Sequence, residues 1–307
     1  MIATRRPIGG RSDREGPVAS GGPLTAAARR TTKALRIGAA RPTSALRPFP
    51  DFLIVGAQRS GTTSLYRYLS RHPAVLPVLF GKGVHYFDTG FDRGPAWYRA
   101  HFPTASRRAR VARREGVEPV SGEGSPYYLF HPLAPERVAA TIPDVRIVVV
   151  LRDPVARAYS HYNHERARGF EDLSFEDAIA AEPERLAGED TRIRHEPGYR
   201  SSSHQHHSYV ARGMYLEQLE RWRAVVGPDR ILILLSEELF ADPDAIYRRT
   251  LSFLGVPERS LASYERANSR AYPPMPERVE ATLRERFAEP NRALAASLGR
   301  PLPWGAP

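Results

Sequence analysis

Residues 56–64 combine glycines, an arginine and hydroxyl side chains in a spacing that suits the binding of a phosphate group. Gly56 and Gly61 lie five positions apart, as in the ATP-binding loop G-x-x-x-x-G-K-[ST]. The lysine of that loop is absent, because Thr62 follows the second glycine, and the nearest cation is Arg59 two positions before it. The segment therefore predicts an anion-binding loop that works without the usual lysine.

Residues 151–160 form a second segment with the chemistry of a phosphate site. Arg152 follows an apolar run directly, and Ser160 comes eight positions later. A guanidinium group binds phosphate oxygens in pairs, so we expect Arg152 to contact a phosphate, while Arg157 either does the same or pairs with Asp153. A kinase would instead need an acidic Mg²⁺ ligand at this point.

Each of these segments is predicted to join a strand to a helix. Residues 51–56 and 145–151 are almost continuously apolar, which is typical of parallel strands covered on both faces. Helices are expected over 62–71 and 154–168. Because the first N–H groups of a helix and its dipole favour an anion, both turns suit phosphate groups.

The rest of the chain continues this alternation of strands and helices. We expect helices over 212–226, 244–254 and 277–298 (the last interrupted by Pro290), a strand over 230–235, loops over 73–105 and 183–209, and an exposed basic segment over 106–116. The pattern predicts an α/β fold of the P-loop type with three layers, in which helices flank a central parallel sheet.

The net charge of +11 is concentrated near the N-terminus. Residues 1–48 contain ten Lys and Arg but only two Asp and Glu, which leaves +3 for all the others. This segment has too few apolar residues to offset the entropy of ordering it. We therefore predict a disordered basic tail over 1–48, able to make a weak contact with an anionic surface, and a folded domain over 49–307.

Several chemical classes are excluded or disfavoured by composition. Cysteine is absent, which excludes disulfides and thiolate chemistry. No stretch approaches the roughly 20 apolar residues that span a bilayer, and no apolar segment follows Arg5 and Arg6 as it would in a signal peptide. These features predict a cytoplasmic protein without a transmembrane segment.

The motifs together resemble those of sulfotransferases that use PAPS (3′-phosphoadenosine 5′-phosphosulfate). Residues 58–64 resemble the 5′-phosphosulfate loop of that family, and residues 152–160 resemble its 3′-phosphate segment. Other stretches resemble the branch related to heparan sulfate sulfotransferases and its bacterial relatives: residues 85–88, 97–98, 122–126, 212–215 and 287–292. The resemblance covers about residues 50–304. It implies transfer of a sulfuryl group to a hydroxyl or amine of a small-molecule or glycan acceptor, with PAP as product and no metal.

The resemblance also implies which residues hold the donor. Arg59, Ser60, Gly61, Thr62, Thr63 and Ser64 would cradle the 5′-phosphosulfate, Arg152 and Ser160 would hold the 3′-phosphate, and Asn268, Ser269 and Arg270 would close over the nucleotide. The family usually has a lysine where Arg59 stands, and that lysine helps to stabilise the leaving phosphate. Arginine supplies the positive charge with a different geometry, so we expect Arg59 to affect the rate of transfer more than the binding of PAPS.

The group that takes the acceptor proton is left open by the sequence. Relatives that act on heparan sulfate often carry a glutamate where this chain has Gly83. His85, whose side-chain type titrates near neutral pH, and Glu123, flanked by glycines that permit close approach, are the two candidate bases. Lys82 and Arg59 are the candidate electrostatic partners. The histidines at 204, 206 and 207 lack a companion ligand at metal-site spacing, and we expect them in a solvated loop.

Three other functions compete with this one. A P-loop phosphotransferase accounts for the first loop but not for the missing lysine, and Mg²⁺-dependent ATP turnover would support it. An inactive nucleotide- or glycan-binding module accounts for the departures at Arg59 and Gly83. A nucleic-acid binder rests on the basic tail alone, so specific nucleic-acid binding is not expected.

Overall fold

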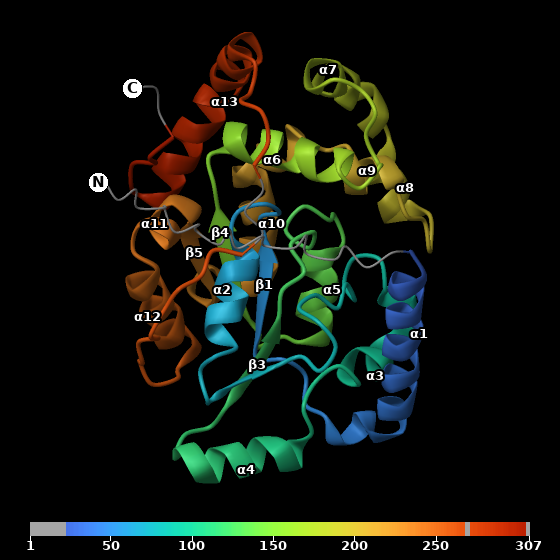
Figure 1. The fold of residues 1–307 in the computed structure, drawn as a ribbon, viewed down its shortest axis with the longest axis vertical. Helices are drawn as coiled ribbons and strands as arrows, with labels where there is room; N and C mark the ends of the chain where they lie inside the picture. The colour runs from blue at the N-terminus through green and yellow to red at the C-terminus, as the bar shows by residue number, and fades with distance from the viewer. Residues whose placement is uncertain (1–22, 268–270, 305–307) are drawn as a thin grey trace, which may run out of the picture.

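The computed structural model describes residues 23–267 and 271–304. Five parallel strands form one sheet in the order β2-β3-β1-β4-β5, with helices packed around it (Figure 1). The strands are β1 (Phe52–Gly56), β2 (Val75–Pro77), β3 (Val120–Glu123), β4 (Arg146–Leu151) and β5 (Ile231–Leu235). The predicted α/β fold with a central parallel sheet is confirmed.

Helices make up most of the remaining described chain. They are α1 (Pro23–Ala40), α2 (Thr62–Leu69), α3 (Gly94–Arg99), α4 (Ala105–Glu115), α5 (Ala134–Thr141), α6 (Pro154–Arg166), α7 (Phe175–Leu186), α8 (Glu189–His195), α9 (Ser202–His206), α10 (Tyr215–Val226), α11 (Ser236–Ala241), α12 (Pro243–Leu254) and α13 (Glu277–Leu298). Short 3₁₀ turns are η1 (Arg41–Leu46), η2 (Phe91–Arg93), η3 (Ala211–Gly213) and η4 (Pro228–Arg230).

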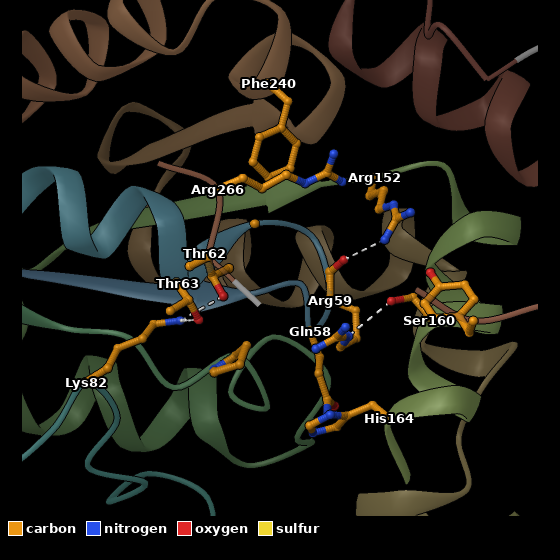
Figure 2. A pocket seen from close by; sticks show the side chains of 14 residues that line it. Gln58, Arg59, Thr62, Thr63, Lys82, Arg152, Ser160, His164, Phe240 and Arg266 are labelled. Carbon is orange, nitrogen blue, oxygen red and sulfur yellow. Dashed lines mark hydrogen bonds between the residues drawn. The ribbon is translucent and has the colours of Figure 1, made fainter. Parts of the chain in front are cut away.

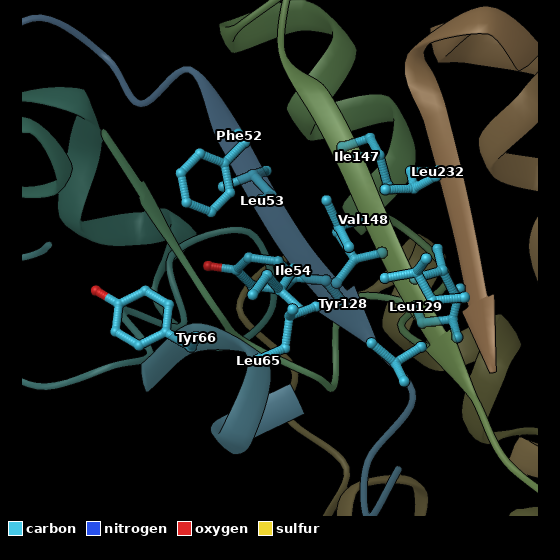
Figure 3. Close-up of a cluster of buried hydrophobic side chains, with 14 of the residues drawn as sticks. Phe52, Leu53, Ile54, Leu65, Tyr66, Tyr128, Leu129, Ile147, Val148 and Leu232 are labelled. Atoms are coloured by element: carbon cyan, nitrogen blue, oxygen red, sulfur yellow. The ribbon is translucent and has the colours of Figure 1, made fainter. Parts of the chain in front are cut away.

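The core lies on both sides of β1 and β4. Every residue of β1 is buried, as is β4 from Ile147 onward, which explains why both strands read as continuous apolar runs. Figure 3 shows the side chains of β1 beside Leu65 and Tyr66 of α2. Burial of one such aliphatic side chain contributes about 1.5–3 kcal/mol. The packed core thus holds the end of β1 and the start of α2 in a fixed relation.

The N-terminal segment differs from the prediction of disorder. Residues 23–46 form α1 and η1, and Ile37 and Ala40 are buried against Ala100, with Trp97 packed beside them. The apolar stripe of α1 is too short to stabilise a helix by itself. Contact with Trp97 of α3 and with Ala100 therefore stabilises α1. The expected disorder is therefore wrong for these residues, while residues 1–22 lie outside the described part of the chain.

Three other local predictions are corrected. The segment 183–209, expected to be a loop, contains the end of α7 and all of α8 and α9. Helix α13 runs through Pro290 without a break, because Phe287 and Leu294 on either side are buried and hold it. The segment 73–105, also expected to be a loop, contains β2, η2 and α3.

Candidate active site

The predicted phosphate loop connects β1 to α2 at the carboxyl edge of the sheet. Its N-cap residue, Gly61, has a φ of 90°, a left-handed conformation that glycine adopts readily. Where β1 ends, a Cβ on Gly56 would lie 2.5 Å from Cβ of Leu129, so only glycine fits there. The turn directs the first N–H groups of α2 toward a pocket, as an anion site requires.

That pocket, the donor pocket, has a volume of about 370 Å³. It is lined by Gln58, Arg59, Gly61, Thr62, Thr63, Lys82, Pro126, Arg152, Ser160, His164, Phe240, Arg266, Ala267 and Tyr272 (Figure 2). Four of these side chains are cations, and none of the described residues that line the pocket is acidic. This set of cationic side chains suits a ligand with several negative charges.

The two segments that the sequence singled out lie side by side in this pocket. Nε of Arg59 donates to Oγ of Ser160 at 3.1 Å, and Nη1 of Arg152 donates to the carbonyl of Arg59 at 3.1 Å (Figure 2). Arg59 therefore reaches toward the middle of α6 rather than across the start of α2. The cation that the family places in the loop is thus turned toward the predicted 3′-phosphate side.

Some predicted residues have other surroundings. Ser60 and Ser64 are fully buried, and Oγ of Ser64 accepts from the N–H of Ala267 at 2.9 Å. Arg157 is buried and donates to the carbonyl of Tyr209, so it neither lines the donor pocket nor pairs with Asp153. Asn268, Ser269 and Arg270 lie outside the described residues.

Sequence reasoning missed several residues of the donor pocket. The guanidinium of Arg266 lies 4.1 Å from the ring centroid of Phe240, a cation–π contact at the pocket wall (Figure 2). Arg266 lies two positions before Asn268, where the segment expected to close over the nucleotide begins, and this closeness was a usable signal. Phe240 carried no such signal in the sequence, because its position at the pocket depends on how α11 packs against the loop.

Lys82 supplies a cation at the start of α2. Its Nζ donates to Oγ1 of Thr62 at 2.8 Å and to Oγ1 of Thr63 at 3.2 Å (Figure 2). Burial lowers the pKa of Lys82 to about 7, although the nearby carboxylate of Glu123 acts in the opposite direction. A Cβ on Gly124 would lie 2.6 Å from Cε of Lys82. The absence of a side chain at position 124 therefore makes room for the lysine.

Glu123 anchors the loop that carries Lys82 and His85. Its buried carboxylate accepts from the N–H of Val84 at 2.9 Å, from Oγ of Ser125 at 2.6 Å and from the hydroxyl of Tyr128 at 2.7 Å. Burial raises the pKa of Glu123, and these hydrogen bonds oppose that rise. Because its oxygens accept these hydrogen bonds inside the core, Glu123 holds the loop that carries Lys82 and His85 in place.

Replacement of Glu123 by glutamine is expected to destabilise the protein. Both carboxylate oxygens accept hydrogen bonds, so the N–H₂ of glutamine would face a donor instead of accepting from it. Loss of a hydrogen bond to a charged acceptor costs about 1.5–3 kcal/mol. Urea unfolding should show a free energy of unfolding lower by at least about 2 kcal/mol. Glu118→Gln is the matched control, since the Glu118 side chain is 73% exposed; equal stability of the two variants would contradict the assignment.

His85 lies at the opening of a cavity that adjoins the donor pocket. Its Nδ1 lies 2.7 Å from Oδ2 of buried Asp88, and its side chain is 44% exposed. Burial alone would raise the pKa of Asp88, but the His85 ring and the N–H of Thr89 hold that pKa below its ordinary value. Ionised Asp88 accepts the Nδ1 proton, which leaves Nε2 as the proton acceptor.

This adjoining space, the acceptor cavity, has a volume of about 220 Å³. It shares Gln58, Pro126 and His164 with the donor pocket, and His85 lines it as well. The arrangement places a polarised histidine beside a polyanion site, with room between them for a second reactant. Such a geometry suits the transfer of a group from an anionic donor to an acceptor that must lose a proton.

Comparison with known proteins supports this interpretation. Residues 49–271 match a family model described as the sulfotransferase domain. The chain belongs to the sulfotransferase domain family. A solved sulfotransferase from Alicyclobacillus acidocaldarius aligns with 83% of this chain and 98% of its own, at 30% identity and a TM-score of 0.62.

Curated relatives of this sulfotransferase domain are larger. It is 28% identical over 290 residues to the human bifunctional heparan sulfate N-deacetylase/N-sulfotransferase 3, covering 83% of this chain and 31% of the relative. It is 30% identical over 215 residues to the mouse heparan sulfate glucosamine 3-O-sulfotransferase 6, covering 68% of this chain and 53% of the relative. The chain thus spans about a third to a half of the relatives it matches.

Of the three histidines expected in a solvated loop, His204 and His206 are buried inside this sulfotransferase domain, and His207 is partly exposed. His204 is buried, stacks on Phe130 and lies 2.7 Å from the hydroxyl of Tyr127, while Nδ1 of His206 lies 2.9 Å from Glu165. Within residues 23–267 and 271–304, no group of three or more His, Asp or Glu is arranged to hold a metal ion. None of the described helices combines the length and apolar character needed to cross a membrane.

Proposed function

We propose that the protein transfers the sulfuryl group of PAPS to a hydroxyl or amine of a carbohydrate. The observation that carries the proposal is the donor pocket, which is lined by four cationic side chains, Arg152 among them, and by the hydroxyls of Thr62, Thr63, Ser160 and Tyr272. Membership of the sulfotransferase family supports PAPS as the donor. The heparan sulfate named for the curated relatives supports a glycan as the acceptor.

The chain's own residues divide between the two ends of the donor. The N–H groups of α2, with Thr62, Thr63 and Lys82, would face the 5′-phosphosulfate, while Arg152 and Ser160 would face the 3′-phosphate. Charge on the leaving phosphate grows as the S–O bond breaks, so a cation preorganised there lowers the barrier. Lys82, which donates to Thr62 and Thr63 at the start of α2, would be that cation.

His85 is our proposed base. In the transfer, the acceptor oxygen or nitrogen forms a bond to sulfur, the bond from sulfur to the 5′-phosphate oxygen breaks, and PAP leaves. The acceptor's proton goes to Nε2 of His85, whose imidazolium form is stabilised by Asp88. Glu123, the alternative base, is less well placed because its carboxylate is enclosed by the core.

The same observations bear on an inactive binding module. That alternative rested on the missing lysine at Arg59 and the missing glutamate at Gly83. Lys82 and His85 supply a cation and a base from neighbouring positions, which favours an active enzyme. A cytoplasmic location, a bacterial type of enzyme and a weak anionic contact through the N-terminal tail stay predictions.

Calorimetric titration with PAP tests the proposed function. We expect PAP to bind the protein more tightly than ATP or ADP with Mg²⁺, and Arg152→Ala to weaken PAP binding about 10- to 100-fold, as loss of charge-assisted hydrogen bonds does. The control is Arg146→Ala, at the opposite end of β4, where the side chain donates to the carbonyl of Leu254. Its PAP affinity should be unchanged.

The outcome that would contradict the proposal is a preference for ATP with no measurable heat from PAP. That result would favour a phosphotransferase. Transfer of radiolabelled sulfate from PAPS to a panel of glycans is the next measurement once PAP binding is established.

A further inference from the structure

A third cavity lies beyond His85, and helix α1 forms one of its walls. This space, the α1 pocket, has a volume of about 470 Å³. It is lined by Ala34 and Gly38 of α1, Arg41 of η1, and Arg93, Trp97 and Arg200 from the rest of the chain, together with His85. The pocket therefore combines the family domain with a segment that precedes the family match at residue 49.

The three cavities are neighbours that share lining residues. The donor pocket and the acceptor cavity share Gln58, Pro126 and His164, while the acceptor cavity and the α1 pocket share His85. His85 thus lies at the boundary between the acceptor cavity and the α1 pocket. An acceptor whose reacting group lies at His85 can extend away from the donor into the α1 pocket.

The α1 pocket is positively charged. Arg41, Arg93 and Arg200 line it, and no carboxylate does so within the described part of the chain. Arg200 is paired with Asp92 at 3.1 Å, and Arg93 lies 4.7 Å from the Trp97 ring centroid. Asp92 offsets one of the three guanidinium groups, and buried Asp88 is bonded to His85. The remaining charge favours an anionic group on the ligand.

Helix α1 is attached to the domain through a small apolar contact. Ile37 and Ala40 face Ala100, Phe80 and Trp97, so the same tryptophan touches α1 and lines the pocket. In Figure 1, α1 lies along one side of the molecule next to α3. The contact holds Gly38 and Arg41 at the pocket rather than leaving them to solvent alone.

We propose that the α1 pocket is an acceptor subsite that binds an anionic group of an extended oligosaccharide, and that the N-terminal segment thereby selects the acceptor. The inference rests on the proposed sulfuryl transfer and adds the acidic character and extended length of its substrate. A neutral sugar would leave the arginines of the pocket without a partner on the ligand. A single sugar would not reach from His85 into the pocket's far side.

Two substitutions test the subsite, each with a control on the same segment. Gly38→Phe places a ring in the pocket, and a Cβ at this position meets no atom within 4 Å, so the helix can accept it. Ala39→Phe adds the same ring at the next position, which is exposed and does not line the pocket. Arg41→Glu reverses a charge of the pocket, and Arg36→Glu reverses an exposed charge of α1 elsewhere.

The probes are a heparan sulfate hexasaccharide and neutral cellohexaose, assayed for binding in the presence of PAP and for transfer from PAPS. We expect Gly38→Phe and Arg41→Glu to raise the KM and Kd for the acidic hexasaccharide about 10-fold or more, which is the scale of one charge-assisted contact. The kcat at saturating acceptor and the Kd for PAP should be unchanged, and both controls should match the unmodified protein.

Two results would overturn the subsite while leaving the proposed function standing. One is equal acidic-acceptor KM in Gly38→Phe and Ala39→Phe, and the other is equal affinity of the unmodified protein for the acidic and neutral hexasaccharides. Failure of the unmodified protein to bind PAP would instead contradict the proposed function. Because PAP binding is measured on every variant, the two failures are distinguishable.

Discussion

Replacement of His85 by glutamine is expected to lower kcat by about 10²- to 10⁴-fold, the usual contribution of a positioned general base. Glutamine keeps the size and polarity of the side chain but cannot take a proton at neutral pH. PAP affinity should be unchanged, because His85 lines the acceptor cavity and not the donor pocket. Steady-state kinetics with radiolabelled PAPS, together with PAP calorimetry, measure both quantities.

The pH profile separates a base from a structural histidine. In the unmodified protein, kcat/KM should fall on the acid side as the base becomes protonated, and this limb should be absent in the residual activity of His85→Gln. Asp88→Asn should also lower kcat, as His85→Gln does, because a neutral amide no longer stabilises the imidazolium form of His85.

A control and a contrary result complete this test. His195→Gln alters an exposed histidine at the end of α8 and should have no effect. If His85→Gln kept its turnover within threefold while folded Glu123→Gln lost activity, Glu123 would be the base and our assignment of His85 would be wrong.

Replacement of Lys82 by methionine is expected to lower kcat by about 10²- to 10³-fold, comparable with the loss of one donor to a developing anion. Methionine retains the length of the side chain and removes the charge that contacts Thr62 and Thr63. PAP affinity should fall by about 10-fold or more, since a charge-assisted contact to the product phosphate is lost as well. Lys82→Arg keeps a charge and should be less impaired.

The low pKa of Lys82 gives this prediction a pH signature. Burial lowers the pKa of the lysine to about 7 in the protein without donor, and a bound phosphate raises it again because it stabilises the ammonium form. Above pH 7, PAP binding must therefore take up a proton, so affinity should fall as pH rises, by up to about tenfold per pH unit. Lys82→Met should lose this dependence.

Gly124→Ala provides an independent variant in which the lysine remains. A Cβ at this position would lie 2.6 Å from Cε of Lys82, so the ammonium must move from Thr62 and Thr63. We expect kcat and PAP affinity to fall as in Lys82→Met but by a smaller factor, measured by the same assays.

Unaltered kcat and an unaltered pH dependence of PAP affinity in Lys82→Met would show that the leaving group does not depend on this lysine.

The sequence by itself determined the parts of the site that are local. The strand, loop and helix around Gly56 to Ser64 could be predicted because an apolar run, two glycines and an amphipathic helix follow one another within about twenty residues. The same holds for the strand that ends directly before Arg152. Since parallel strands end at one edge of their sheet, these local motifs were enough to predict the fold class and the kind of ligand.

Only the tertiary structure decided which side chains lie together at the candidate active site. Lys82 contacts Thr62, twenty positions away in the chain, because Gly124 leaves space for it. The carboxylate of Glu123 accepts hydrogen bonds from Val84 and Tyr128 inside the core, which is why we favour His85 as the base. Helix α1 was missed since its short apolar stripe gains free energy only when α3 covers it. Such contacts join residues that are far apart in the chain, so no local periodicity or motif spacing in the sequence predicts them.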